Sequence, residues 1–221
     1  MPTLVERTAR QLADLSLSGE SDRFLGSEDD LLTRFGISRP TLRQAAKMVA
    51  NDRLIAVRRG GGGGFYATRP DAADSVRALA RYLRLRGASL SDIMVVTRSV
   101  SEEGAALAAG SDDAALRDEL AAFAARIEAN DTPAAIVRAE TELARILAAM
   151  SGNPAIELVM AIGFSFGLEE QSGRLFANPE ERARARELQR ALVDAVLARD
   201  GEVARLMMQR RSAQFAAWLA R

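Results

Sequence analysis

The sequence predicts a mainly α-helical protein, with a small mixed unit in residues 1–70 and an antiparallel helical bundle in residues 71–221. The first part holds three helix-like apolar patterns, followed by two short alternating segments around a run of five glycines. Every later segment has helical apolar spacing, and capping residues separate these segments. Hydrophobic residues make up 48% of the chain, which is enough for a core in each part.

The composition narrows the possible chemistry. The chain has no cysteine and no histidine, so it lacks thiolate ligands and the side chain that most often moves protons near neutral pH. A G-x-S-x-G pattern at residues 163–167 lacks the histidine base and the strand that a serine nucleophile requires. We therefore expect neither an enzyme nor a cofactor.

No charged and then apolar leader opens the chain, and no apolar run approaches the roughly 20 residues of a membrane span. These features predict a cytoplasmic protein without membrane contact.

Two helices are expected before the first turn. Apolar spacing predicts the first over residues 3–15, and a polar loop follows it. Ser27 with Asp30 three residues later is typical of a capping box, so it predicts the start of the second helix. Gly36 is expected to end that helix.

The third helix is predicted to have Ser38 as its N-cap and Pro40 in its first turn, and to run to about Asn51. Residues 54–58 and 64–68 alternate as two short strands joined by the glycines. The order helix, helix, turn, helix, hairpin is the plan of a winged helix-turn-helix. The inward stripe of the third helix is predicted to be Leu42, Ala45, Ala46 and Val49.

Basic residues are concentrated in this region. Residues 34–69 contain eight basic residues and one acidic residue, whereas residues 1–33 contain three basic and seven acidic residues. The formal net charge of the chain is zero, so the location of the charge is the informative property. A concentrated cationic segment is typical of a surface that meets nucleic-acid phosphates.

Arg39 and Arg43 are four residues apart and project from one side of the third helix, in the half that enters a major groove in this plan. Arg58 and Arg59 stand beside the glycines, where they can hold backbone phosphates. The alternatives are solvated surface arginines and a merely flexible hairpin tip. The candidate DNA contacts are Ser38, Arg39, Thr41, Arg43, Gln44, Lys47, Arg58, Arg59, Gly62 and Gly63.

About six or seven helices are expected in residues 71–221, with no strand. Their expected N-terminal caps are Ser89 or Ser91, Ser111 with Asp112, Thr132, Asn153, Asn178 and Asp200. The residues expected in the core or lining a pocket are Phe164, Phe166, Phe215, Trp218 and Leu219.

The pattern L-x-S-E…F-G-I-S-R-x-T-L-R-Q-A…R-R-G…G-F resembles the GntR superfamily of bacterial transcription regulators. Residues 98–109, 140–154 and 189–200 resemble the FCD domain of its FadR-like branch. The resemblance implies a homodimer that binds an inverted-repeat operator in double-stranded DNA. It also implies a small organic effector, either a carboxylate or an acyl thioester.

Two departures from the family pattern concern DNA and metal binding. Asp29 stands where the family often has arginine, which implies that one phosphate contact is lost. Many FCD domains hold a divalent metal, and the corresponding positions here are Glu140, Ala144, Gln189 and Arg211. Because only Glu140 would ligate well, we expect no metal. Arg211 is expected to replace that cation by pairing with Glu140 or with an effector's carboxylate; the alternative is a surface arginine.

The candidate effector contacts are Arg98, Glu140, Gln189 and Arg211. For Arg98 the alternative is an ordinary ion pair with Glu102 on the same helix. For the whole chain we expect a ligand-responsive, DNA-binding transcription regulator. The remaining alternatives are a helical scaffold that binds protein partners and has nonspecific DNA affinity, and an enzyme in the helical part.

Overall fold

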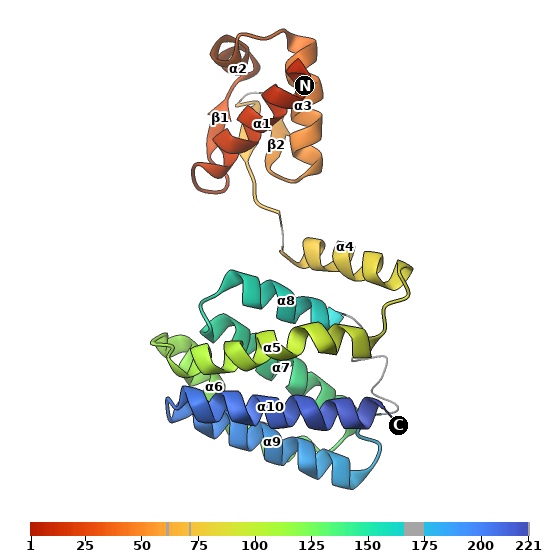
Figure 1. Cartoon of the computed structure of the whole chain (residues 1–221). Helices are drawn as coiled ribbons and strands as arrows, with labels where there is room; N and C mark the ends of the chain where they lie inside the picture. The colour runs from red at the N-terminus through yellow and green to blue at the C-terminus, as the bar shows by residue number, and fades with distance from the viewer. Residues whose placement is uncertain (61, 71, 166–174, 221) are drawn as a thin grey trace. The chain divides into compact units, whose positions relative to one another are not determined.

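The computed structural model describes residues 1–60, 62–70, 72–165 and 175–220 (Figure 1). The chain divides into two compact units, Met1–Asp74 and Ser75–Arg221. We call them the winged unit and the helical unit. The boundary expected after residue 70 lies four residues before this division, which falls inside helix α4.

The winged unit contains three helices and a three-stranded antiparallel sheet of order β1-β3-β2. The helices and the β2–β3 hairpin lie where the sequence predicts them, to within two residues at each end. Strand β1 was not predicted, because three residues are too short for a pattern and form a strand only by pairing with β3. The elements are α1 (Leu4–Leu17), β1 (Phe24–Gly26), α2 (Glu28–Phe35), α3 (Arg39–Asn51), β2 (Ile55–Arg58) and β3 (Gly64–Ala67).

Local signals set the ends of α2. The Ser27 hydroxyl accepts from the Asp30 amide, and the Asp30 carboxylate accepts from the Ser27 amide at 2.9 Å, so the predicted capping box is confirmed. The Ser27 hydroxyl also donates to the Asp30 carboxylate at 2.7 Å, and this bond, together with the one from the Ser27 amide, holds the pKa of Asp30 below its ordinary value. Gly36 ends the helix in the left-handed conformation, with φ of 62°, which favours glycine.

Ser38 is the N-cap residue of α3, with Pro40 in the first turn, as predicted. Its hydroxyl lies 2.9 Å from the Thr41 hydroxyl and does not cap a helix amide. The predicted inward stripe is confirmed, because Leu42 and its three partners on that face are all buried. Helix α3 packs on α1, so the apolar face of α3 is covered and its basic face is left outside.

The described part of the helical unit consists of seven α-helices and one 3₁₀ turn, which confirms a helical bundle. Helix α5 lies against α7, α8, α9 and α10 (Figure 1). The elements are α4 (Ala72–Leu85), α5 (Leu90–Ala109), α6 (Ala114–Arg126), η1 (Ile127–Ala129), α7 (Pro133–Met150), α8 (Pro154–Ser165), α9 (Pro179–Leu197) and α10 (Gly201–Leu219).

Most of the predicted caps are confirmed. Ser89 caps α5, and Thr132, Asn178 and Asp200 cap α7, α9 and α10 with their side chains. The cap predicted at Ser111 with Asp112 is wrong. Ser111 still donates its amide to the end of α5, so the neighbouring Asp113 caps α6 instead.

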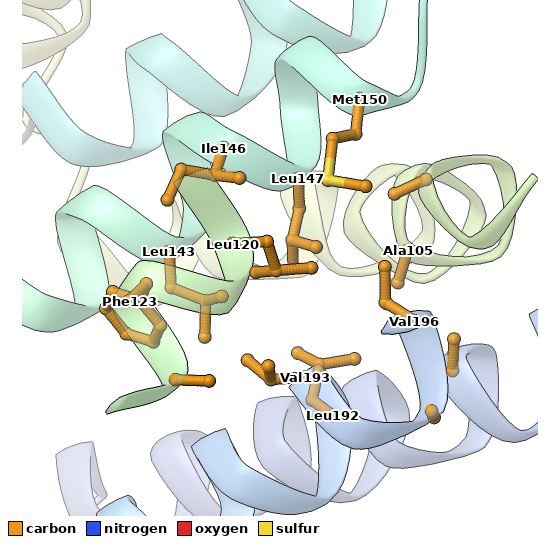
Figure 2. Packing of buried hydrophobic residues seen from close by; sticks show 14 of the residues in the cluster. Ala105, Leu120, Phe123, Leu143, Ile146, Leu147, Met150, Leu192, Val193 and Val196 are labelled. Atoms are coloured by element: carbon orange, nitrogen blue, oxygen red, sulfur yellow. The ribbon is translucent and has the colours of Figure 1, made fainter. Parts of the chain in front are cut away.

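The main core of the helical unit is built from α5, α6, α7, α9 and α10 (Figure 2). Phe123 and Leu120 from α6 meet Leu143 from α7 and Leu192 from α9, and each is at most 1% exposed. A second cluster joins Phe215 and Trp218 of α10 to Ile136 of α7 and Phe176. The predicted packing role of Phe215 and Trp218 is therefore confirmed.

The G-x-S-x-G pattern does not form the turn of a serine nucleophile in the part that is described. Helix α8 continues through residues 163–165, whereas that turn requires a strand leading into a helix. The side chain of Phe164 and all of Phe166 lie outside the described residues. No helix in the described part of the chain has both the length and the apolar character needed to cross a membrane.

Candidate functional site

The N-terminal half of α3 presents a row of exposed polar side chains. The Arg39 and Arg43 side chains are 62% and 71% exposed, although α3 also contributes to the core. Ser38, Gln44 and Lys47 are exposed too, and Thr41 is half-buried. This exposure follows from the helical period, because the buried stripe lies on the opposite face.

Both arginines are held by acids from the first turn of α2. Arg39 Nη2 lies 2.9 Å from Asp29 Oδ1, and Arg43 Nε lies 3.1 Å from Glu28 Oε1. Pairs this exposed contribute little to stability, typically about 0–1 kcal/mol. Their effect is to place two negative charges beside the guanidinium groups on the exposed face of α3.

The hairpin tip is ordered by Tyr66, a residue that the sequence analysis did not select. The Tyr66 hydroxyl donates to the Gly62 carbonyl at 2.9 Å, and its ring lies 4.0 Å from the Arg58 guanidinium carbon. Arg58 also lies 3.2 Å from Asp22, and Arg59 is exposed. The sequence shows only that a tyrosine, Tyr66, follows an apolar residue in the predicted strand. Its contact with Gly62 could not be predicted, because it depends on how the turn folds back on the strand.

The glycines are needed for the shape of this turn. Gly62 has φ of 83°, a conformation that L side chains rarely adopt. The Gly63 amide donates to the Gly60 carbonyl at 2.7 Å, and a Cβ at Gly63 would lie 2.8 Å from that carbonyl. Glycine is therefore needed at Gly62 and Gly63. Gly61 lies outside the described residues.

The helical unit contains a cavity of about 360 Å³, lined by residues of α5, α7, α8 and α10. This volume lies in the lower part of the range of small-molecule sites, about 300–1,000 Å³. The walls are mainly apolar. Apolar residues from three helices line it, among them Ile93, Met94, Met160, Phe215 and Leu219.

Three of the four candidate effector residues lie on this cavity, namely Arg98, Glu140 and Arg211. The fourth, Gln189, is fully buried behind Glu140, to which its Nε2 donates at 2.8 Å. Arg98 also makes the alternative contact, because its Nε lies 3.4 Å from Glu102. Both interpretations of Arg98 are therefore compatible with its position.

Arg211 and Glu140 form an ion pair at the cavity wall, through Nη2 and Oε2. The Arg211 side chain is 11% exposed and that of Glu140 is 1% exposed, so Arg211 does not point into solvent. Burial lowers the pKa of Arg211 to about 10, which keeps the guanidinium charged at neutral pH. Of the two partners expected for Arg211, Glu140 is the one present.

The residues at the positions implied for a metal do not fit a divalent ion. Glu140 is the one carboxylate among them, and its Oε2 already pairs with Arg211. Ala144 has no donor atom, and Gln189 is directed to the other oxygen of Glu140. In the described ranges no three acidic residues gather as a metal-binding group. The positive charge at this place belongs to the guanidinium itself.

Comparison with known proteins identifies the helical unit. The model of the FCD domain matches residues 92–212, which is more than half of the chain. No curated protein matches the sequence. The chain resembles the solved structure of a GntR protein of Streptococcus agalactiae, with TM-score 0.68 and 22% identity; the match covers 98% of this chain and 100% of that one.

Two other solved structures are less similar. E. coli McbR/YncC has TM-score 0.45 and 18% identity over 100% of this chain and 98% of that one. A GntR family member from Pseudomonas syringae pv. tomato has TM-score 0.46 and 16% identity over 99% of this chain and 86% of that one. The likeness to the Streptococcus agalactiae GntR protein shows the fold of the chain, and the domain match shows its family: the chain belongs to the FCD-domain family.

Proposed function

We propose that the chain binds an inverted-repeat operator in double-stranded DNA as a homodimer, and that a small organic effector bound in the helical unit changes the DNA affinity. The observation that carries the first part is the exposure of Arg39 and Arg43 on one face of α3. The same unit carries the glycine hairpin, where the Tyr66 hydroxyl donates to the Gly62 carbonyl. An arginine in this half of the helix can bind guanine through two hydrogen bonds or hold a phosphate.

Two-fold symmetry of a homodimer requires a palindromic site, because each winged unit then contacts one half-site in the same way. The effector part rests on the cavity of about 360 Å³ and its charged residues. A coupling of about 1–3 kcal/mol between the two sites would change DNA occupancy by one or two decades.

The test uses duplexes that the wild-type protein selects from a random pool, and an unselected duplex as reference. Replacing Arg43 by alanine should weaken binding to the selected duplex by about ten- to one-hundred-fold, the effect of losing about 1–3 kcal/mol of base discrimination. Binding to the unselected duplex should change far less. Gel shift or fluorescence anisotropy at fixed salt gives both affinities.

Arg210→Ala is the matched control, because it removes the same charge from an exposed position of α10. It should leave both affinities unchanged. The proposal fails if neither wild type nor Arg43→Ala binds the selected duplex more tightly than the unselected one. That result would favour a scaffold protein with nonspecific DNA affinity. Selected sequences without an inverted repeat would contradict the homodimer.

Asp29 should weaken the attraction of the winged unit for any duplex. Its carboxylate lies beside Arg39 and would be close to the phosphates that Arg39 approaches. Asp29→Asn removes a repulsion of about 1 kcal/mol, as expected for unit charges about 4 Å apart in water. We therefore expect about five-fold tighter binding to the unselected duplex and a steeper decrease of affinity with salt.

The matched control for this variant is Asp14→Asn, an exposed aspartate of α1. It should change neither property. Equal salt dependence for wild type and Asp29→Asn would show that Asp29 lies away from the bound duplex.

A further inference from the structure

Arg211 lines the cavity with N–H donors that the described residues leave without good acceptors. Nη2 pairs with Glu140, and Nη1 donates only to the thioether sulfur of Met208, at 3.5 Å. Nε is buried and has no hydrogen-bond partner in the described part of the chain. Sulfur is a weak acceptor, and a buried donor without a partner carries a desolvation penalty. A ligand oxygen in the cavity would remove that penalty.

The charges around Arg211 leave room for one anionic group and disfavour two. The buried carboxylate of Glu140 balances Arg211, so the ion pair alone is neutral. The other cation on the cavity is Arg98, which lies 3.4 Å from Glu102 through Nε and has further N–H groups for a ligand carboxylate. A second ligand carboxylate would find no further cation among the described residues that line the cavity. Unpaired buried charges are strongly unfavourable.

The rest of the cavity selects an apolar body. Ile93 and Met94 of α5, Met160 of α8, and Phe215 and Leu219 of α10 contribute apolar surface to its walls. Each buried methylene group of a ligand is worth about 0.8 kcal/mol. A volume of about 360 Å³ limits this body to a compact one.

We propose that the cavity binds an organic monocarboxylate with a compact apolar body, whose oxygens accept from the free donors of Arg211 with no metal ion between them. This inference rests on the proposed function for its assignment of the cavity as the effector site. An acyl thioester fits less well, because its acyl end carries no charged oxygen to accept from the free donors of Arg211.

The first experiment uses octanoate as the probe, with octanol as its uncharged match and octanedioate as its doubly charged match. The full chain is dialysed against EDTA, and binding is measured by calorimetry and thermal shift. Octanoate should bind and raise the melting temperature, because it binds only the native state. Octanol and octanedioate should bind at least ten-fold more weakly, and adding Zn²⁺ or Mg²⁺ should not change the octanoate affinity.

The second experiment tests the role of Arg211 in a variant that is expected to fold. The double substitution Glu140→Gln with Arg211→Gln removes both buried charges; it keeps the size of the first side chain and shortens the second. Its octanoate affinity should decrease by about ten- to one-hundred-fold, the effect of a lost hydrogen bond to a charged group. Its affinity for octanol should stay the same, which a purely structural role of Arg211 would not predict. Arg210→Ala should bind octanoate as wild type does.

Three results would overturn the inference. They are octanoate binding that requires a divalent metal, equal octanoate affinity of the double variant and wild type, and no binding by any straight-chain monocarboxylate from butyrate to decanoate. Each result leaves the DNA proposal intact if the selected duplex is still bound in preference to the unselected one. Conversely, a chain without duplex selectivity would contradict the proposed function whatever octanoate does.

Discussion

Arg211→Gln alone is expected to lower the free energy of unfolding of the helical unit by about 3–5 kcal/mol, because it leaves the carboxylate of Glu140 buried without its cation. Glu140 would keep one hydrogen bond, from Gln189. Urea unfolding followed by circular dichroism measures the change. The two units need not unfold together, so the transition of the helical unit has to be fitted separately.

The double variant Glu140→Gln with Arg211→Gln should recover part of this loss, since it removes the uncompensated buried charge that the single variant leaves. The single and double variants with wild type form a thermodynamic cycle that isolates the interaction between the two side chains. Additive effects of the two substitutions would show that the pair is not coupled, and would contradict the buried ion pair.

Leu42→Ala should destabilise the winged unit by about 2–5 kcal/mol, whereas the change at the next residue, Arg43→Ala, should leave its stability almost unchanged. Leu42 is fully buried in the core between α1, α3 and the sheet, while Arg43 is 71% exposed. Two adjacent residues of α3 are therefore expected to have different roles, Leu42 in stability and Arg43 in DNA binding. Chemical unfolding and the duplex assay, measured on both variants, give the two effects separately.

Met48→Ala is the control for Leu42→Ala, because Met48 is an apolar side chain on the same helix that is 43% exposed. It should cost well below 1 kcal/mol. A loss at Leu42 no larger than at Met48 would contradict the packing of α3 described above. If Arg43→Ala also lowers the free energy of unfolding of the winged unit, its weaker DNA binding can no longer be assigned to a lost contact.

Properties that depend on neighbouring residues could be predicted from the sequence. The capping box of Ser27 and Asp30 was found because it joins residues three apart. The cap at Thr132, and Ser89 as one of two alternatives, were found from residue types that favour the start of a helix. The buried stripe of α3 followed from the helical period. The cap at Asp113 was missed, because Ser111 and Asp112 are equally suitable by type and the end of α5 decides between them.

Strand β1 and the contacts of the basic face could not be predicted in the same way. Three residues become a strand only where β3 offers an unpaired edge. Asp29 was selected as a departure from the family, but its pairing with Arg39 depends on the angle between α2 and α3. Tyr66 contacts Gly62 and Arg58 because the turn brings the strand and the loop together.

The sequence by itself determined the order of the helices and the β2–β3 hairpin in the winged unit, the concentration of positive charge on one segment and the absence of histidine and cysteine, because these depend on residue type and short spacing. The pairing of Arg211 with Glu140 was one of the alternatives that the sequence left open. The tertiary structure decided that the two side chains pair, that both lie on a cavity, and that two guanidinium donors there lack good acceptors among the described residues. Glu140 comes from α7 and Arg211 from α10, and burial strengthens the electrostatic attraction between them. Both burial and the choice of partner depend on how the helices pack, which no local pattern contains.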